Sequence, residues 1–320
     1  MGEARVRDDC RRDPRGLRSR SAGLWRARGA GQCRAPADGP TPTRPSSFGT
    51  VSLPTPSPQR TVVVTGASSG IGEELAREFA RRGHGLVLVA RREERLRSLA
   101  EDLADRGVRI EIAPLDLSDA ADRASLLPLV DEWGLEADVL VNNAGLSTTG
   151  PVHSGSPDAE MNMIEVNVVA VADLTTRLLP EMVGRGRGGI LNVASTAAFQ
   201  PMPGQAGYAA CKAFVLSYTR GLVGELRGTG VSATALCPGP VHTEFGEVAG
   251  FDEEATKSTI PDFVWTEAPD VARAGIDAFA RGRQVVIPGA ANRVTAAAAT
   301  LTPKELLVPA LARMHPALRD

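Results

Sequence analysis

Two residues that stand four apart, Tyr208 and Lys212, have the types and the spacing needed for proton transfer. On an α-helix of about 3.6 residues per turn, they project from one face on successive turns. A phenol titrates near pH ~10 unaided, and an ammonium group one turn away favours the phenolate and lowers that pKa. Ser195 ends the apolar run 189–195, which predicts a buried parallel strand, and ligands bind at the carboxyl edge of such a sheet. We therefore expect the Ser195 hydroxyl and the Tyr208 phenol to converge on one substrate oxygen.

A tyrosine and a lysine at this spacing also occur on helices that carry no chemistry, so the pair needs support from the rest of the chain. The composition favours a role for Lys212. Only three of the 36 basic residues are lysines (Lys212, Lys257 and Lys304), and the others are arginines. Lysine is the cation that can tune a neighbouring pKa and donate to a ribose hydroxyl without a rigid fork.

The composition also bounds the class of protein. A chain of 320 residues with 42% hydrophobic and 23% charged residues is typical of an ordinary α/β protein. Its net charge of −2 gives no reason to expect nucleic acid or an anionic membrane as a partner, and no apolar run reaches the ~18–20 residues of a membrane span. The four cysteines, Cys10, Cys33, Cys211 and Cys237, lack metal-ligand spacing. We expect no metal, reduced thiols and a cytoplasmic location.

Residues 1–58 differ from the rest of the chain. Their first half is rich in arginine and their second half in Pro, Ser and Thr, without apolar periodicity, so we expect a disordered extension. It lacks the apolar core of a secretory signal, and acidic residues near its start argue against a mitochondrial presequence. Our hypothesis is that residues 1–50 are not part of the natural protein and that translation starts at Val51, as valine codons allow in a high-GC gene.

From Gln59 onward, apolar strands alternate with helical stretches. We expect strands at 61–66, 86–90, 110–115, 138–145, 189–195, 231–239 and 284–289, and helices at 71–82, 92–106, 119–133, 157–184, 206–228 and 268–281. Strands separated by helices of this length indicate βαβ crossovers and a parallel sheet with helices on both faces. The sequence therefore predicts an α/β fold: a Rossmann-type, doubly wound, seven-stranded parallel sheet in a single domain, residues 59–291. A helical tail, residues 292–320, is expected to pack on this body or on a partner subunit.

The stretch Thr65–Gly72 directly follows the first expected strand and opens the next helix. Its glycines, Gly66, Gly70 and Gly72, have the spacing G-x-x-x-G-x-G. Glycine suits a tight turn that a pyrophosphate approaches closely, and the helix N-terminus beyond offers N–H groups and a positive dipole end. In this strand–turn–helix context the motif predicts a dinucleotide site.

The end of the second expected strand bears on the choice of dinucleotide. NAD-binding versions of this fold usually place an acid there for the ribose 2′-hydroxyl. Here the strand ends in Ala90, and Arg91 follows as a partner for a 2′-phosphate. Arg91 also opens the polar run 91–95, so a solvated charged stretch is the alternative. The missing acid is the stronger argument, and we expect NADP(H) rather than NAD(H).

Six motifs together resemble those of the short-chain dehydrogenases/reductases. They occur in the family's order and spacing over about residues 60–290, and they are Thr65–Gly72, Asn142-Asn143-Ala144-Gly145, Asn167, Ser195, Tyr208-x-x-x-Lys212 and the stretch 238–245. The resemblance implies that Tyr208 is the general acid in reduction and the general base in oxidation. It implies that Lys212 lowers the Tyr208 pKa and bonds the nicotinamide ribose, and that Ser195 polarises the substrate carbonyl. Asn167 resembles the family's asparagine that holds a proton-relaying water; a helix-kink role is the alternative.

The resemblance also implies the cofactor contacts. In the family, the Asn143–Gly145 backbone lines the adenosine ribose, Asp116 contacts the adenine, and Val241 and Thr243 hold the carboxamide and phosphate side. The asparagines could instead be strand-end caps, and Asp116 a turn former. Some NADP-preferring members carry a basic residue within the glycine turn, where this chain has serines. The expected cofactor-binding set is Gly66, Ser68, Ser69, Gly70, Ile71, Gly72, Arg91, Asp116, Leu117, Asn143, Ala144, Gly145, Tyr208, Lys212, Pro238, Gly239, Val241 and Thr243.

Residues 244–265 fall where the family's substrate lid lies. Their aromatic residues indicate an apolar pocket wall or, alternatively, the seam that docks the lid; they are Phe245, Phe251, Phe263 and Trp265. We expect an oxidoreductase that interconverts a ketone or aldehyde, with apolar character, and an alcohol. The alternatives are a non-catalytic NADP sensor or scaffold, and an extended-type epimerase or dehydratase, whose glycine spacing and larger C-terminal domain this chain lacks. By family habit we expect a homodimer or homotetramer through helices 157–184 and 206–228.

Overall fold

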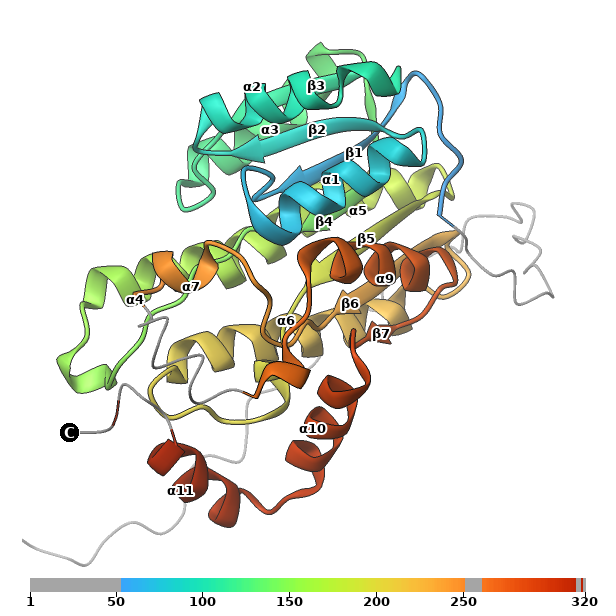
Figure 1. Cartoon of the computed structure of the whole chain (residues 1–320). Coiled ribbons are helices and arrows are strands. Elements are labelled where there is room, and N and C mark those ends of the chain that lie inside the picture. Colours follow the sequence, from blue (N-terminus) through green and yellow to red (C-terminus); the bar gives the residue numbers. More distant parts are fainter. Residues whose placement is uncertain (1–52, 251–260, 315–317, 319–320) are drawn as a thin grey trace, which may run out of the picture. The chain divides into compact units, whose positions relative to one another are not determined.

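The computed structural model describes residues 53–250, 261–314 and 318, all within one compact unit, Pro45–Asp320. Its centre is a seven-stranded sheet in the order β3-β2-β1-β4-β5-β6-β7, with every pairing parallel (Figure 1). This confirms the predicted doubly wound α/β sheet. The strands are β1 (Arg60–Thr65), β2 (Gly85–Ala90), β3 (Ile110–Pro114), β4 (Glu136–Asn142), β5 (Gly188–Val193), β6 (Val231–Leu236) and β7 (Val285–Val286).

Helices cover both faces of this sheet, and the core alternates with the strand period. On β1, Val62 and Val64 pack with one layer of helices, while Val63 faces the other layer. Because both faces are covered, the strands are apolar on both sides. The first layer is α1 (Gly70–Arg81), α2 (Glu93–Asp102) and α9 (Ala268–Ala280); the second is α3 (Ala120–Glu132), α5 (Ala170–Gly184) and α6 (Ala206–Glu225).

The strand order reverses between β1 and β4, which makes their carboxyl edge the topological switch point where ligands bind in such folds. A buried polar chain fixes the neighbouring strands there. Asn142 on β4 donates to Asn192 Oδ1 on β5 (2.8 Å) and to Thr175 Oγ1 on α5 (3.1 Å), and Asn192 donates to Thr219 Oγ1 on α6 (2.9 Å). Since buried polar groups are costly without partners, this hydrogen-bond network favours one arrangement of β4, β5, α5 and α6.

The boundaries of several elements differ from the sequence prediction for local reasons. The strand expected at 231–239 ends at Leu236, and Pro238, which has no N–H, follows. The strand expected at 284–289 pairs only at Val285 and Val286, before Pro288 and Gly289, whose φ is 83°. The strand expected at 138–145 ends at Asn142, because the next N–H group bonds a threonine hydroxyl instead of the sheet.

The helix expected at 157–184 is divided into three pieces. α4 (Pro157–Ile164) and α5 are joined by one π-helical stretch, Glu165–Val169. π-turns of this kind often occur at functional sites, and this one contains Asn167. The expected helix 92–106 likewise ends at Asp102 and is followed by a 3₁₀ turn, Ala104–Arg106.

The chain on either side of the sheet also departs from the expected boundaries. Residues 1–52 of the predicted extension lie outside the described residues, but Leu53 already packs against the core. At the other end, α10 (Ala290–Leu301) crosses the expected boundary at residue 292 and packs on two 3₁₀ turns, Thr196–Phe199 and Asp262–Val264. α11 (Lys304–Met314) follows. Among the described residues, no helix has both the length and the apolar character for a membrane crossing.

Candidate active site

The glycine turn between β1 and α1 packs its backbone tightly against the end of β4. Gly66 has a φ of 66° and Gly70 a φ of 58°, a region that favours glycine. A methyl group at Gly66 would lie 2.8 Å from Cα of Ala144, and one at Gly72 would lie 2.2 Å from the carbonyl oxygen of Gly66. Side chains at these two positions would therefore collide with backbone atoms.

The N-terminus of α1 fits a phosphate group. Ser69 is the N-cap residue, but its side chain makes no capping hydrogen bond, so the first N–H groups of α1, from Gly70 and Ile71 onward, have no side-chain cap. The nearest atoms to a methyl group built at Gly70 belong to Thr243, at 3.1 Å. An uncapped helix start beside a glycine turn is suited to the pyrophosphate of a dinucleotide.

Thr65 joins the glycine turn to the end of β4, a role that the sequence analysis did not assign. Its hydroxyl donates to Val141 O (3.1 Å) and accepts from the N–H groups of Asn143 (3.0 Å) and Ala144 (3.1 Å). The Asn143 side chain returns two bonds, to the carbonyl oxygens of Thr65 (2.9 Å) and Gly66 (3.2 Å). The asparagine side chain therefore holds the turn, which leaves the backbone of residues 143–145 as the group that could line a ribose.

Arg91 and Asp116 face each other beyond the ends of β2 and β3, with 3.8 Å between Arg91 Nη1 and Asp116 Oδ2. Ser118 donates to Asp116 Oδ1 from its N–H (3.0 Å) and its hydroxyl (2.8 Å), so the Asp116 side chain stabilises the turn that follows β3. Leu117, between Asp116 and Ser118 in the sequence, is buried. Burial raises the pKa of Asp116, but the Ser118 bonds and the Arg91 charge outweigh it, and the net pKa is lowered. Asp116 is thus an anion at neutral pH, with both carboxylate oxygens available as acceptors.

Arg92, which the sequence analysis left in the polar run, lies across the glycine turn. Its Nε is 3.2 Å from Ser68 Oγ, and its Nη2 is 2.8 Å from Ser69 Oγ. Its Nη1 donates to Glu244 Oε2 at 3.1 Å. A basic side chain from the end of β2 therefore lies on the glycine turn, and the two serines of the turn hold it.

The proposed catalytic side chains meet where β5 and α6 approach each other. Ser195 follows β5, where its hydroxyl accepts from the Ala197 N–H (3.1 Å). Lys212 is buried on α6; its Nζ donates to Val193 O (3.0 Å) and lies 5.7 Å from the centroid of the Tyr208 ring. The Ser195 hydroxyl interacts with the Tyr208 phenol and is the group that most strongly lowers the Tyr208 pKa. The structure thus brings the three expected side chains together.

Burial changes the titration of this pair in a direction that the sequence analysis did not expect. It raises the pKa of Tyr208 to about 12, against the lowering effect of Ser195. It also lowers the pKa of Lys212 to about 8. The net pKa of Tyr208 is not lowered, because loss of hydration disfavours the phenolate more than its neighbours favour it. That Lys212 lowers it stays a prediction. Tyr208 is a neutral phenol at pH 7, ready to donate.

Asn167 closes the same region from the π-helical stretch. Its Oδ1 accepts from the Leu146 N–H, and its Nδ2 donates to Leu146 O, both at 2.8 Å. A methyl group at Gly145 would lie 3.1 Å from Asn167 Oδ1 and 3.3 Å from Lys212 Nζ. Asn167 and Lys212 therefore converge beside Gly145, and the Asn167 amide keeps one lone pair and one N–H for a further partner.

The loop after β6 passes in front of the glycine turn. Pro238 accepts from the Thr196 N–H (2.8 Å), and a methyl group at Gly239 would lie 2.3 Å from Asn292 Oδ1. Val241 forms an isolated parallel bridge with Thr266. This loop brings Thr243 opposite Gly70.

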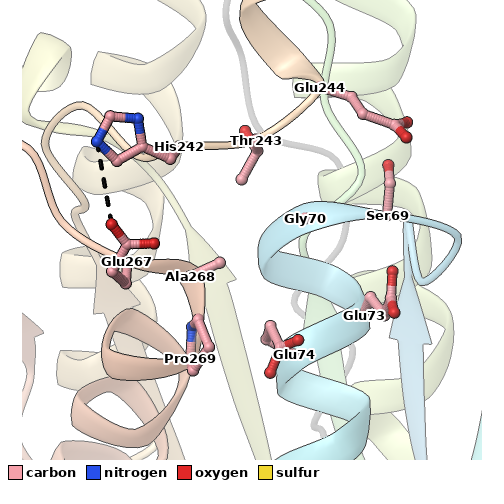
Figure 2. Close-up of a pocket in the computed structure, with 10 residues that line it drawn as sticks. All are labelled: Ser69, Gly70, Glu73, Glu74, His242, Thr243, Glu244, Glu267, Ala268 and Pro269. Carbon is pink, nitrogen blue, oxygen red and sulfur yellow. Dashed lines mark ion pairs between the residues drawn. The ribbon is translucent and has the colours of Figure 1, made fainter.

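A cavity of about 290 Å³ lies between this loop and the start of α1 (Figure 2). In Figure 2, Ser69 and Glu244 point to the same side of the turn, while His242 faces Glu267 at 4.0 Å. Within the described part of the chain, no cluster of three or more His, Cys, Asp or Glu side chains is arranged to hold a metal ion. The cavity is lined by Ser69, Gly70, Glu73, Glu74, His242, Thr243, Glu244, Glu267, Ala268 and Pro269.

The expected lid aromatics have different positions. Phe245 begins the short helix α7 (Phe245–Val248), and its ring centroid lies 5.8 Å from that of Tyr208. Trp265 stacks on His242 with 4.5 Å between centroids, whereas Phe263 is 74% exposed. Phe251 lies outside the described residues. Phe245 is therefore the lid residue that meets the catalytic side chains in the described structure, and the expectation of a wall that includes Phe263 is not met.

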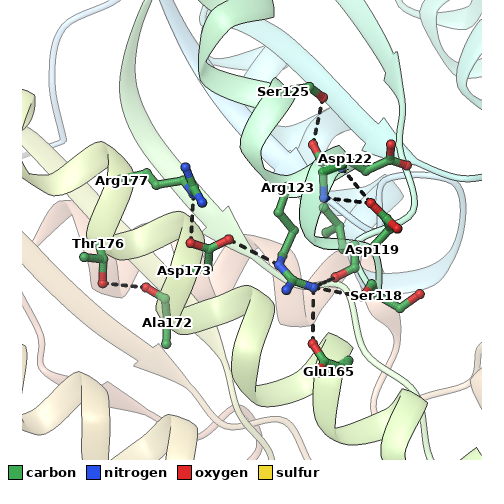
Figure 3. A network of polar contacts seen from close by, with 12 residues as sticks. Ser118, Asp119, Asp122, Arg123, Ser125, Glu165, Ala172, Asp173, Thr176 and Arg177 are labelled. Carbon is green, nitrogen blue, oxygen red and sulfur yellow. Dashed lines mark hydrogen bonds and ion pairs between the residues drawn. The ribbon is translucent and has the colours of Figure 1, made fainter. Parts of the chain in front are cut away.

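A buried arginine, Arg123, lies at the centre of a network of polar contacts (Figure 3). Arg123 of α3 donates to the carbonyl oxygens of Leu117 (2.8 Å) and Ser118 (3.0 Å) in the loop after β3. It also pairs with Glu165 in the π-helical stretch (3.3 Å) and with Asp173 on α5 (3.2 Å). Arg123 thus links the loop of Asp116 to the stretch that contains Asn167; only the folded chain reveals this link.

Comparison with known proteins establishes the family of this chain. Residues 60–253 match the short chain dehydrogenase family. A short-chain dehydrogenase from Sphingobium yanoikuyae, solved in complex with NADPH, is 37% identical, has a TM-score of 0.67, and is matched over 75% of this chain and 92% of that chain. The chain belongs to the short-chain dehydrogenase family, as its six motifs predicted.

Two of the similar proteins are named as a reductase and a dehydrogenase. Sulfoacetaldehyde reductase 2 of Chromohalobacter salexigens is 39% identical over 214 residues, which cover 66% of this chain and 84% of that protein. The NADP-dependent 3-hydroxy acid dehydrogenase YdfG of Escherichia coli strain K12 is 40% identical over 202 residues, which cover 62% of this chain and 80% of that protein.

Proposed function

We propose that this chain is an NADP(H)-dependent oxidoreductase that interconverts a ketone or aldehyde and an alcohol. The observation that supports it most is the convergence of Ser195, Tyr208 and Lys212 at the carboxyl edge of the sheet, next to an uncapped helix start. The family and the names of the NADP-dependent and NADPH-bound relatives give the same reaction class and cofactor. The catalytic unit in this proposal is the domain of residues 59–291.

The cofactor supplies or accepts the hydride, and the side chains of the chain handle the proton. In reduction, the Ser195 hydroxyl holds the substrate carbonyl oxygen, and Tyr208 donates its proton to that oxygen, which the raised pKa of Tyr208 permits at neutral pH. Lys212 would bond the nicotinamide ribose, and Asn167 would hold the water that returns a proton through Lys212. The turn of Gly66–Gly72 would take the pyrophosphate, and Arg91 and Arg92 the 2′-phosphate.

The substrate class follows from the surroundings of Tyr208. Phe245 offers an apolar ring 5.8 Å from it, which favours a carbonyl compound with an apolar substituent. Gln205, the N-cap residue of α6, donates from Nε2 to Ser147 Oγ at 3.0 Å, so a polar pair is also present at the start of α6. The two curated relatives are named for a small aldehyde and for hydroxy acids, so both apolar and acidic carbonyl compounds belong in a test panel.

We also propose a homodimer or homotetramer and a cytoplasmic location. Alanines of α6 line a mainly apolar groove of about 540 Å³; they are Ala206, Ala209, Ala210 and Ala213. Phe214 on the same helix is 38% exposed. Such a surface is suited to a second copy of the chain. Cys211 and Cys237 are buried free thiols, which is compatible with a reducing compartment.

The test is a comparison of wild type with Tyr208→Phe on residues 51–320. NADPH and NADH titrations measure binding, and a carbonyl panel followed at the nicotinamide absorbance measures turnover. Tyr208→Phe should keep NADPH binding and lose turnover by about 10²–10⁴-fold, because only the proton donor is removed. Retained turnover in the variant would overturn the proposed mechanism. Tight binding by wild type without turnover of any panel member would favour a sensor over an enzyme.

A further inference from the structure

Arg123 is a charged side chain at a position of α3 that faces the interior. It is 5% exposed and stands on the same stripe of the helix as Leu126 and Val130, which are also buried. Arginine is almost never buried to this extent unless it is paired, because an isolated charge away from water is very costly. The partners of Arg123 therefore indicate what it does in this fold.

The Arg123 guanidinium contacts three separate segments of the chain (Figure 3). Its Nη1 donates to the carbonyl oxygens of Leu117 (2.8 Å) and Ser118 (3.0 Å), in the loop after β3. Its Nε donates to Asp173 Oδ2 at 3.2 Å, and its Nη1 lies 3.3 Å from Glu165 Oε2. One side chain thus connects the loop after β3 to two places on the helical run from α4 to α5.

The contact with Glu165 differs from the contact with Asp173 in place and in kind. Glu165 is the first residue of the π-helical stretch, whereas Asp173 lies in the first turn of the regular helix α5. Glu165 Oε2 is buried and accepts no hydrogen bond from any described residue, so the attraction of opposite charges holds it to Arg123. Asp173 accepts hydrogen bonds both from Arg123 and from Arg177 Nε (2.8 Å).

The π-helical stretch brings Asn167 into the site. Asn167 is 1% exposed, and its Oδ1 and Lys212 Nζ both lie within 3.3 Å of a methyl group built at Gly145. A π-helical turn is uncommon and interrupts the α-helical hydrogen-bond pattern, so contacts from outside the helix must favour it. Glu165, two residues before Asn167, makes such a contact through Arg123.

We propose that Arg123 is a positioning residue for the proton relay and that it acts through Glu165. The pair fixes the start of the π-helical stretch, and so holds Asn167 against Lys212. Through its bonds to the loop after β3, the same arginine also fixes the part of the cofactor site that contains Asp116. This inference rests on the proposed function, in which Asn167 and Lys212 pass on the proton.

Two substitutions that keep the shape of the side chain separate this role from simple stabilisation. Glu165→Gln removes the charge that Arg123 holds at the π-helical stretch. Asp173→Asn, the matched control, removes the other carboxylate that pairs with Arg123 but leaves the pair at the π-helical stretch. Arg123→Met removes both ion pairs and the two bonds to carbonyl oxygens. Thermal unfolding of each variant gives a temperature at which all of them are folded, and the comparison is made there.

Lys212 can be observed directly, because the chain has only three lysines. Lysine labelled with carbon-13 at the ε-position gives one NMR signal for each of them, and Lys212→Met identifies the signal from the site. The titration of that signal with pH reports the surroundings of Nζ without any turnover. Calorimetry with adenosine 2′,5′-bisphosphate reports the adenosine part of the cofactor site. The kcat and the KM for NADPH, with the best substrate of the carbonyl panel, report the reaction.

The three variants should differ in these measurements. Glu165→Gln should shift the Lys212 signal and its titration and lower kcat by roughly 10- to 100-fold, as expected when a group of the site is displaced slightly. Its KM for NADPH and its affinity for the bisphosphate should stay as in wild type. Asp173→Asn should leave all of these quantities unchanged, whatever its effect on stability. Arg123→Met should repeat the effects of Glu165→Gln and also weaken binding of the bisphosphate.

Failure of this inference can be told apart from failure of the proposed function. If Glu165→Gln leaves the Lys212 signal and kcat as in wild type, or if Asp173→Asn changes them equally through loss of charge alone, the positioning role of Arg123 is overturned and the proposed function stands. If wild type turns over no carbonyl compound, but Glu165→Gln alone shifts the Lys212 signal, the link from Arg123 to Lys212 is supported and the proposed function is overturned.

Discussion

Replacement of Gly72 by alanine sets two physical effects against each other. Gly72 lies within α1 and is not among the glycines with positive φ, so helix propensity alone predicts that alanine stabilises the protein by about 1 kcal/mol. The surroundings predict the opposite. The new methyl group would lie 2.2 Å from the carbonyl oxygen of Gly66 and 2.3 Å from Asn143 Nδ2. Both partners lie where hydrogen bonds join the end of β1 to the end of β4, so neither can shift without breaking some of those bonds.

The magnitude follows from what must give way. Overpacking of this kind costs about 1–3 kcal/mol. Displacement of the Asn143 amide weakens its bonds to Thr65 O and Gly66 O, at roughly 0.5–1.5 kcal/mol each. After the helix-propensity gain is subtracted, we expect Gly72→Ala to lower the free energy of unfolding by about 1–5 kcal/mol. Near the middle of that range, the melting temperature falls by roughly 6–12 °C.

The assay is thermal and urea unfolding followed by circular dichroism, at equal protein concentrations. The matched control is Gly221→Ala on α6, where a methyl group would meet no atom within 4 Å. There helix propensity acts alone, and we expect stabilisation by about 0.5–1 kcal/mol. If Gly72→Ala were as stable as wild type, or more so, the tight packing of the glycine turn on β4 would be wrong.

Two further predictions concern the charged residues of the site. Arg92→Ala should weaken NADPH binding roughly 10- to 100-fold, as expected for loss of a charge-assisted hydrogen bond, and Arg91→Ala should weaken it less. NADH binding should change little in both variants. Equal losses for both nucleotides in parallel fluorescence titrations would refute these roles. The pKa of Lys212 is about 8 in the folded chain, against 10.5 ordinarily. Between those values the unfolded chain binds the extra proton, so the stability of wild type relative to Lys212→Met should rise with pH by up to about 1.4 kcal/mol per unit. Urea unfolding of both proteins between pH 7 and 10 measures this, and a flat or falling difference contradicts the buried position of Lys212.

The sheet and the order of the motifs could be predicted because their signals are local. Each strand is a short apolar run, each crossover has a helical length, and the turn Thr65–Gly72 sits between the two patterns. The convergence of Ser195 with Tyr208 follows from that order, because a strand end and the next helix start share one edge of the sheet. The element ends were less predictable, since they depend on single hydrogen bonds, such as that from the Asn143 N–H to the Thr65 hydroxyl.

The directions of side chains beyond a strand end could not be predicted in this way. Strand alternation ends at Ala90, and Arg92, with φ of −84° and ψ of 85°, has neither strand nor helix geometry. Sequence reasoning therefore could not say which arginine crosses the glycine turn and which faces Asp116. The partner of Arg92, Glu244, is 152 residues away along the chain. Such a contact depends on the loop after β6, whose path is set by the fold and not by any local period.

The titration of Tyr208 shows how burial can reverse an inference from spacing. The spacing to Lys212 accounts for a nearby charge, but the fold also removes water from both groups, and this disfavours the charged form of each. The pKa of Tyr208 is consequently raised to about 12, while that of Lys212 is lowered to about 8. A phenol that holds its proton this firmly is suited to donate as substrate oxygen gains charge, whereas the reverse step needs the phenolate.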